Sequence, residues 1–293
     1  MSTGTRRGTS LVELLVALPL AVLAATAAAL LLLRIARPAR AQSAALTVSR
    51  ELRHARLLLA ADLEPISGRD LHIVSDSLLE FTGQLGVAAV CSVANAYSLE
   101  VAVPPQSAGQ WLGAARAGDR VRGWLMPVYP AMPPERVVRV LAADPVVSGL
   151  RTCGADTVNR ATIWRFTFHD SAFHRLYGTT VSVHRDVRFR HYSSGGLWWM
   201  GRQSRIGGQW DGLQPVAGPL VTPAQRGLEI EARDAQGRSD VINLTTPDSV
   251  RARMVGLTIG MRMRRRVRET WAPAADSVEI IVPLRASNQR RAP

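Results

Sequence analysis

The sequence contains no lysine, only two cysteines and none of the short motifs that mark common enzyme active sites. All 36 basic residues are therefore arginine, a bias that carries no functional information by itself. No nucleophile elbow, phosphate-binding loop or dinucleotide-binding fingerprint occurs. We therefore expect neither enzymatic activity nor a bound cofactor.

The histidines and cysteines are too scattered to form a metal-binding motif. No Cys-x-x-Cys pair is present, and no two of the six histidines have ligand spacing on a convincing helix. A calcium site in the loop from Asp234 to Asp240 would need several oxygen ligands, and Arg233 and Arg238 crowd that loop. We predict no metal site.

The composition allows a membrane segment and one sizeable domain, or two small ones. With 47% hydrophobic and 20% charged residues in a chain of 293, the protein is neither a disordered chain nor a polytopic membrane protein. The net charge of +13 suits nucleic acid, lipid headgroups or an acidic partner. It also suits an exported domain that charge keeps soluble, and we favour this simpler interpretation.

A long stretch without charge follows the N-terminus. It runs from Leu14 to Leu33, is rich in Leu and Ala, and as a helix would span roughly 30 Å, the thickness of a bilayer core. These residues predict one membrane-spanning helix, since only a helix satisfies its own backbone in lipid. Pro19 lies inside it and predicts a kink.

Three kinds of N-terminal segment compete to explain this pattern. A secretory signal could end at Ala39-Arg40-Ala41, but its apolar region should be much shorter. A twin-arginine signal fits Thr5-Arg6-Arg7, but the apolar residue that should follow is replaced by Gly8-Thr9-Ser10. A plain uncleaved anchor is the third.

None of these explains Glu13. A carboxylate at the start of an apolar helix costs about 2–3 kcal/mol to place in the bilayer, and less near its edge. Such a residue calls for a partner, unless the helix N-terminus and nearby water stabilise it.

The segment from Arg6 to Leu18, RRGTSLVELLVAL, resembles the leader of type IV prepilins and type II secretion pseudopilins. That family has a short basic leader ending in Gly, with Glu fifth after the cut. The resemblance implies cleavage between Gly8 and Thr9 by a membrane aspartyl peptidase and N-methylation of Thr9, although Thr replaces the usual Phe or Met. It also implies that Glu13 neutralises the amino terminus of a neighbouring subunit during assembly.

A second helical pattern follows the apolar stretch. Leu46, Val48, Leu52, Ala55, Leu59 and Leu63 recur at spacings close to three and four, which predicts an amphipathic helix over about residues 41–63. Pro38 predicts a break or kink before it, and Pro65 and Gly68 predict its end. A helix that is half apolar and half packed on a sheet is the spine of the pilin architecture.

Beyond residue 70 the period changes to two, and glycine-containing turns separate the runs. Alternating segments that predict strands lie at 98–103, 162–168, 180–184, 255–263 and 278–282. We therefore predict an α+β fold, in which a long N-terminal transmembrane and amphipathic helix packs on a mainly antiparallel β domain. The expected parts are a leader (1–8), an assembly helix (9–35), its amphipathic continuation (36–65) and a β-rich periplasmic domain (66–293).

The segment from Gln214 to Glu231 and the acidic turn Asp234-Ala235-Gln236-Gly237 resemble large minor pilins of the W-like group and J-type minor pseudopilins. The length of the chain also favours a minor subunit, since major pilins are usually much shorter. The resemblance implies a single-pass inner-membrane protein whose C-terminal domain lies in the periplasm. Its partners would be the membrane, the prepilin peptidase and other subunits of a pilus, a secretion pseudopilus or a competence filament.

Two further features suggest secondary sites. Cys91 and Cys153 both follow the apolar stretch, and an oxidising compartment would favour a disulfide between them over two buried thiols. The segment 251–271 is rich in arginine, and Arg262, Arg264, Arg265, Arg266 and Arg268 form a possible basic patch. One interpretation of this segment is that it captures nucleic acid, with Trp271 stacking on a base. The other is a surface strand with an arginine face, and we favour this one.

The leader generates the first prediction. Mass spectrometry of the mature protein should find Thr9 at the amino terminus, carrying an added methyl group. Replacing Gly8 with a bulky residue should leave the full-length precursor in the membrane, because the resemblance implies a leader that ends in glycine. A mature terminus at Gln42 would instead identify a secretory signal.

Overall fold

A computed structural model describes residues 11–95, 97–103, 114–124, 135–146, 151–153, 156–158, 162–169, 180–267 and 270–285, with side chains for fewer of them. The chain divides into two compact units. One consists of residues 1–50 and 265–272, and the other of residues 51–264 and 273–293.

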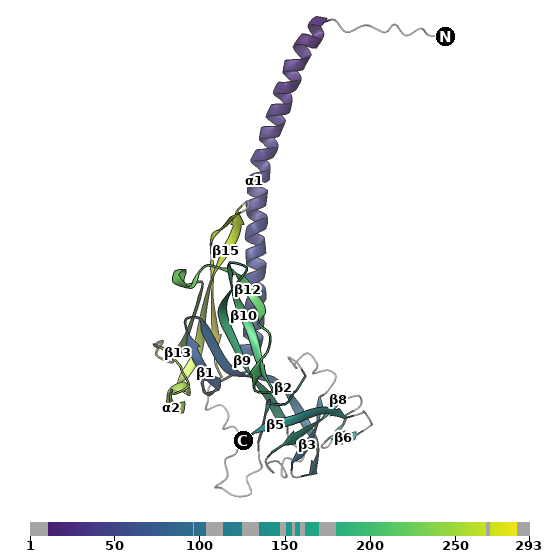
Figure 1. Cartoon of the computed structure of the whole chain (residues 1–293), viewed down its shortest axis with the longest axis vertical. Coiled ribbons are helices and arrows are strands. Elements are labelled where there is room, and N and C mark those ends of the chain that lie inside the picture. Colours follow the sequence, from purple (N-terminus) through teal and green to yellow (C-terminus); the bar gives the residue numbers. More distant parts are fainter. Residues whose placement is uncertain are drawn as a thin grey trace, which may run out of the picture. The chain divides into compact units, whose positions relative to one another are not determined.

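The first element is a single long helix, α1, from Leu11 to Leu63 (Figure 1). It is helical through Pro19 and Pro38, so the break considered at Pro38 does not occur. Proline removes one backbone hydrogen bond, and the intact turns on both sides can maintain the helix. The segment from Leu15 to Ala36 is 22 residues long, with a mean hydropathy of 2.5 and no buried part. It is long and apolar enough to cross a membrane.

The last turns of α1 belong to the folded β-rich unit. Leu52, Ala55, Leu59 and Leu63 are buried, which confirms the predicted apolar face for this part of the helix. Asp62 accepts hydrogen bonds from Arg202 Nε (2.7 Å) and Nη2 (3.3 Å) and so ties α1 to a strand. Leu46, which the pattern placed on the same face, is 59% exposed.

Antiparallel strands make up most of the remainder, as the change of period predicted. The strands are β1 (Leu71–Ser75), β2 (Leu78–Asn95), β3 (Ser98–Val103), β4 (Arg120–Trp124), β5 (Glu135–Val146), β6 (Arg151–Cys153), β7 (Asp156–Val158), β8 (Thr162–Phe168), β9 (Thr180–Ser194), β10 (Leu197–Ile206), β11 (Gln209–Trp210), β12 (Gln214–Leu220), β13 (Leu228–Asp234), β14 (Ser239–Asp240), β15 (Met254–Val267) and β16 (Thr270–Pro283). Short helical turns lie at Gly68–Asp70 and Pro223–Gln225, and α2 covers Asp248–Arg251. The predicted strands 98–103 and 162–168 coincide with β3 and β8.

The long strands β2 and β9 pair with each other and belong to two parts of the sheet, a closed ring of strands and an extended part. Residues 187–194 of β9 also pair with β10, whereas residues 181–184 pair with β4. Since β2 pairs with β3, β3 with β8, β8 with β5, and β5 with β4, these five strands close into a ring with β9. We call it the strand ring. In the other direction the sheet continues from β9 through β10, β12, β15 and β13 to β14.

The strand ring has an apolar core of its own. Its buried side chains come mainly from alternate positions of these strands: Leu85, Ala88, Val90, Leu99, Val101, Val121, Val138, Val140, Phe166, Phe168, Val181 and Val183. Ala115, from the segment before β4, completes this cluster.

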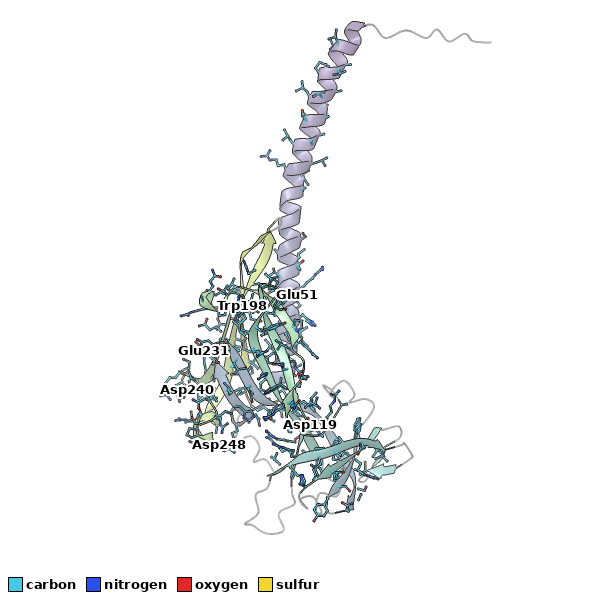
Figure 2. All side chains as sticks on the ribbon, in the orientation of Figure 1. Glu51, Asp119, Trp198, Glu231, Asp240 and Asp248 are labelled. Carbon is cyan, nitrogen blue, oxygen red and sulfur yellow. The ribbon has the colours of Figure 1, made fainter. Side chains whose placement is uncertain are left out.

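One ion pair fixes the segment that enters β4. Arg185 donates from Nε and Nη2 to the two oxygens of Asp119, both at 2.7 Å, and its Nη2 also donates to the Ala114 carbonyl at 2.8 Å. The side chain of Asp119 (labelled in Figure 2) has no solvent exposure, and that of Arg185 is 8% exposed. Burial raises the pKa of the Asp119 carboxyl, although the hydrogen bonds and charge of Arg185 oppose that rise. Each member of this buried ion pair therefore depends on the opposite charge of the other.

Removing Asp119 should therefore destabilise the protein strongly. Asp119→Ala leaves the Arg185 guanidinium buried without its counter-charge, which typically costs about 3–5 kcal/mol. Urea unfolding of the full chain in a neutral detergent, followed by tryptophan fluorescence, measures this loss. The matched control Asp240→Ala removes an exposed aspartate and should change the unfolding free energy by less than about 0.5 kcal/mol. Equal effects of the two substitutions would contradict the role given to the pair.

Candidate functional site

The N-terminal residues singled out by the sequence fall partly outside the described structure. Gly8 and Thr9 precede the described residues, and the side chain of Glu13 is not among those described. The backbone at Glu13 is helical and belongs to α1, two residues before the apolar segment that begins at Leu15. The charge therefore stands at the N-terminal end of a segment that can serve as a membrane anchor or a signal sequence.

The cysteine prediction receives support at one of its two positions. Cys91, near the end of β2, is disulfide-bonded, and the chain has one other cysteine, Cys153. Cys153 ends the short strand β6, which lies against β2, but its side chain lies outside the described residues. The bonded state of Cys91 agrees with the predicted bridge, and the identity of its partner stays a prediction.

The arginine-rich strand has the expected alternation where its side chains are described. Met261 and Met263 on β15 are buried, whereas Arg262 between them is exposed and Arg264 is half-buried. The side chains of Arg265, Arg266, Arg268 and Trp271 lie outside the described residues. The basic patch therefore stays a prediction.

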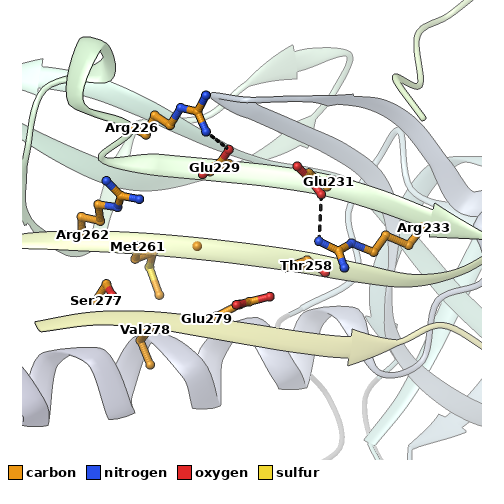
Figure 3. Close-up of a pocket in the computed structure, with 11 residues that line it drawn as sticks. Arg226, Glu229, Glu231, Arg233, Thr258, Met261, Arg262, Ser277, Val278 and Glu279 are labelled. Carbon is orange, nitrogen blue, oxygen red and sulfur yellow. Dashed lines mark hydrogen bonds and ion pairs between the residues drawn. The ribbon is translucent and has the colours of Figure 1, made fainter. Parts of the chain in front are cut away.

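The outward face around Arg262 carries both signs of charge (Figure 3). It forms a pocket of about 240 Å³ between β13, β15 and β16, lined by three glutamates and three arginines together with uncharged residues. Arg226 contacts Glu229 at 3.2 Å and Arg233 contacts Glu231 at 3.0 Å, while Glu279 enters from β16. A phosphate backbone favours a continuous positive track, so the glutamates make this part of the face a poor path for nucleic acid.

In the Asp234–Asp240 loop, the carboxylate of Asp234 is hydrogen-bonded to other residues of the same loop. Asp234 accepts hydrogen bonds from the backbone N–H groups of Gln236 (2.9 Å) and Arg238 (3.0 Å) and from Arg238 Nε (2.9 Å). Among the described residues, no group of three or more His, Cys, Asp or Glu side chains is placed to hold a metal ion.

A polar cluster around Asp186 was not recognised from the sequence. Thr82 Oγ1 donates to Asp186 Oδ1 at 2.9 Å, and Arg120 Nη2 donates to Oδ2 at 3.0 Å. His72 Nε2 lies 2.8 Å from Thr82 Oγ1 and 3.7 Å from the carboxylate. Burial raises the pKa of the Asp186 carboxyl, but His72 and Arg120 outweigh it and the pKa is lowered. The only signal in the sequence is the alternation of charged residues along β9.

Comparison with known proteins does not identify the chain, because no family model, curated protein or solved structure matches it. The described residues establish an α+β protein in which a long helix with an apolar N-terminal part precedes a mostly antiparallel sheet.

The bonded state of Cys91 leads to a direct test of the predicted bridge. A non-reduced digest should contain one peptide pair joined through Cys91 and Cys153, and reduction should separate it. Closing a loop of about 60 residues stabilises a domain by up to about 4 kcal/mol on the chain-entropy model. Cys91→Ser should therefore lower the unfolding free energy substantially, and Cys153→Ser should do so equally. Alkylation of both thiols without prior reduction would contradict the bridge.

Proposed function

We propose that this protein is a structural subunit of a type IV filament-like machine, a minor pilin or a minor pseudopilin of type II secretion. The observation that carries the proposal is the order of features at the N-terminus. A short basic segment ends in Gly8, Glu13 occupies the fifth position after it, and an apolar helical segment from Leu15 to Ala36 follows.

The continuity of α1 supports this proposal over an ordinary secretory signal. The apolar segment and the buried residues Leu52, Ala55 and Leu59 belong to one helix. A helix that begins as a membrane segment and ends inside a folded unit can hold that unit at the membrane and later pack it into a filament. A cleaved secretory signal has no need of such continuity.

Assembly would proceed through the N-terminal helix. The prepilin peptidase cuts after Gly8, the new amino terminus at Thr9 is methylated, and the apolar segment holds the subunit in the inner membrane. The Glu13 carboxylate then meets the amino terminus of a neighbouring subunit, so that two charges inside an apolar bundle neutralise each other. The β-rich unit lies in the periplasm throughout.

Nucleic-acid capture by the segment 251–271 is the alternative, and the described residues do not favour it. Arg262 shares its face with Glu229, Glu231 and Glu279, which break the run of positive charge.

The assembly proposal is tested by separating membrane insertion from incorporation. Glu13→Ala removes a charge from an apolar helix, so the protein should remain membrane-bound. Its incorporation into sheared filaments, measured by immunoblot, should fall several-fold because the neighbouring amino terminus loses its counter-charge.

Glu51→Ala is a matched control, since Glu51 is an exposed carboxylate on the same helix outside the apolar segment (Figure 2). It should assemble like the unaltered protein. Normal assembly of Glu13→Ala would remove the reason for assigning the residue a role.

A further inference from the structure

A second pocket lies where β9 changes neighbours. At this point β10 ends at Ile206 and β4 begins at Arg120, so the extended sheet gives way to the strand ring. Two turns meet there, because Gly207 N–H donates to the Ala117 carbonyl at 3.0 Å. The pocket has a volume of about 240 Å³, and its wall includes Arg139, Arg205 and Asp186.

Positive charge is concentrated around this pocket. Arg120 and Arg139 are directly opposite each other on β4 and β5, so both side chains lie on the same face of the sheet. Like charges at directly opposed positions destabilise a strand pair unless something compensates them. The Asp186 carboxylate compensates Arg120, to which it is hydrogen-bonded at 3.0 Å. Arg139 has no such partner among the described residues and is exposed.

Arg205 faces the pocket with its terminal nitrogens free to donate. Its Nε donates to the Gly208 carbonyl at 3.1 Å, which anchors the guanidinium beside the turn. Its Nη1 is 3.9 Å from Asp186 Oδ2, too far for a hydrogen bond, and within the described chain neither Nη atom makes one. The cluster of Arg120, Arg139 and Arg205 thus faces the Asp186 carboxylate, which Thr82 and Arg120 already occupy. The Glu80 carboxylate on β2 also attracts Arg205, so three arginines face two carboxylates.

The two turns beside the pocket contain glycines that other residues could not easily replace. Gly118 has φ +92° and Gly208 has φ +88°, conformations that other residues adopt with strain. A Cβ atom at Gly118 would lie 3.1 Å from Gly207 N, so a side chain there would press the two turns apart.

We propose that this pocket binds a single oxyanion, a carboxylate or a phosphate group, between the guanidinium groups of Arg139 and Arg205. Guanidinium groups bind both kinds of oxyanion through paired N–H donors. The pocket is smaller than the roughly 300–1,000 Å³ typical of sites for whole small molecules. It therefore suits one anionic group, such as free phosphate or an acidic side chain of another protein, and not a nucleotide. The proposal does not depend on the assembly function.

The test uses the full chain in dodecyl maltoside and two probes. Binding of inorganic phosphate is followed by ³¹P line broadening, and binding of N-acetyl-glutamate amide by saturation-transfer difference NMR. We expect saturable binding of at least one probe. Arg139→Gln and Arg205→Gln should each weaken it at least tenfold, whereas Arg253→Gln, which removes an exposed arginine away from the pocket, should weaken it less than twofold. Thermal unfolding midpoints equal to that of the unaltered protein establish that the variants fold.

The outcomes separate the possible sources of the anion. Binding of phosphate alone assigns a free phosphate site, and binding of the glutamate probe assigns a site for an acidic side chain. Saturable binding of neither probe would overturn the proposal, as would equal losses in all three variants. A single-stranded oligonucleotide that binds far more tightly than phosphate through the same two arginines would also overturn it, because the ligand would then be an extended polyanion.

Discussion

The antiparallel pairing of β2 with β9 is the contact on which both parts of the sheet depend. It brings together Thr82 and Asp186, which are 104 positions apart in the sequence. On one side of this pair, β9 continues to β10, whose Arg202 binds Asp62 of α1. On the other side, the same pair closes the strand ring through β3, β8, β5 and β4. Ordering so long a loop costs conformational entropy before the contacts within it form. The ring's own apolar core, with Phe166 and Val183 fully buried, offsets that cost.

Local features of the fold were predictable from the sequence, and long-range ones were not. The strands β3 and β8 alternate apolar and polar residues between clear turns, so their limits could be read directly. The burial of Leu59 and Leu63 likewise follows from helical spacing. The ring does not follow, because periodicity says which face of a strand is buried but not which strand lies beside it. Continuity of α1 through Pro38 was also missed, since one proline weakens a helix without necessarily ending it.

The candidate sites were likewise only partly predictable from the sequence. The alternation of Met261 and Arg262 identified an arginine face on β15, but three glutamates on that face come from β13 and β16. Sequence spacing within one strand cannot reveal charges that neighbouring strands contribute. The Asp186 cluster is an extreme case, because its members come from β1, β2, β4 and β9.

Acidic residues organise the many arginines of this chain. Asp62 binds Arg202, Asp119 binds Arg185 and Asp186 binds Arg120, and each of these carboxylates is largely shielded from water. A carboxylate removed from water needs hydrogen bonds to both oxygens. The fork of a guanidinium supplies both at Asp62 and Asp119, whereas at Asp186 Arg120 binds one oxygen and Thr82 the other. With 36 basic and 23 acidic residues, however, the chain cannot give every arginine such a partner. The excess charge must face solvent or a ligand, and at Arg139 and Arg205 the strand pairing and the glycine turns hold two such groups around one pocket. Positive charge that is merely needed for solubility requires no such grouping around one pocket, because dispersed arginines serve equally well.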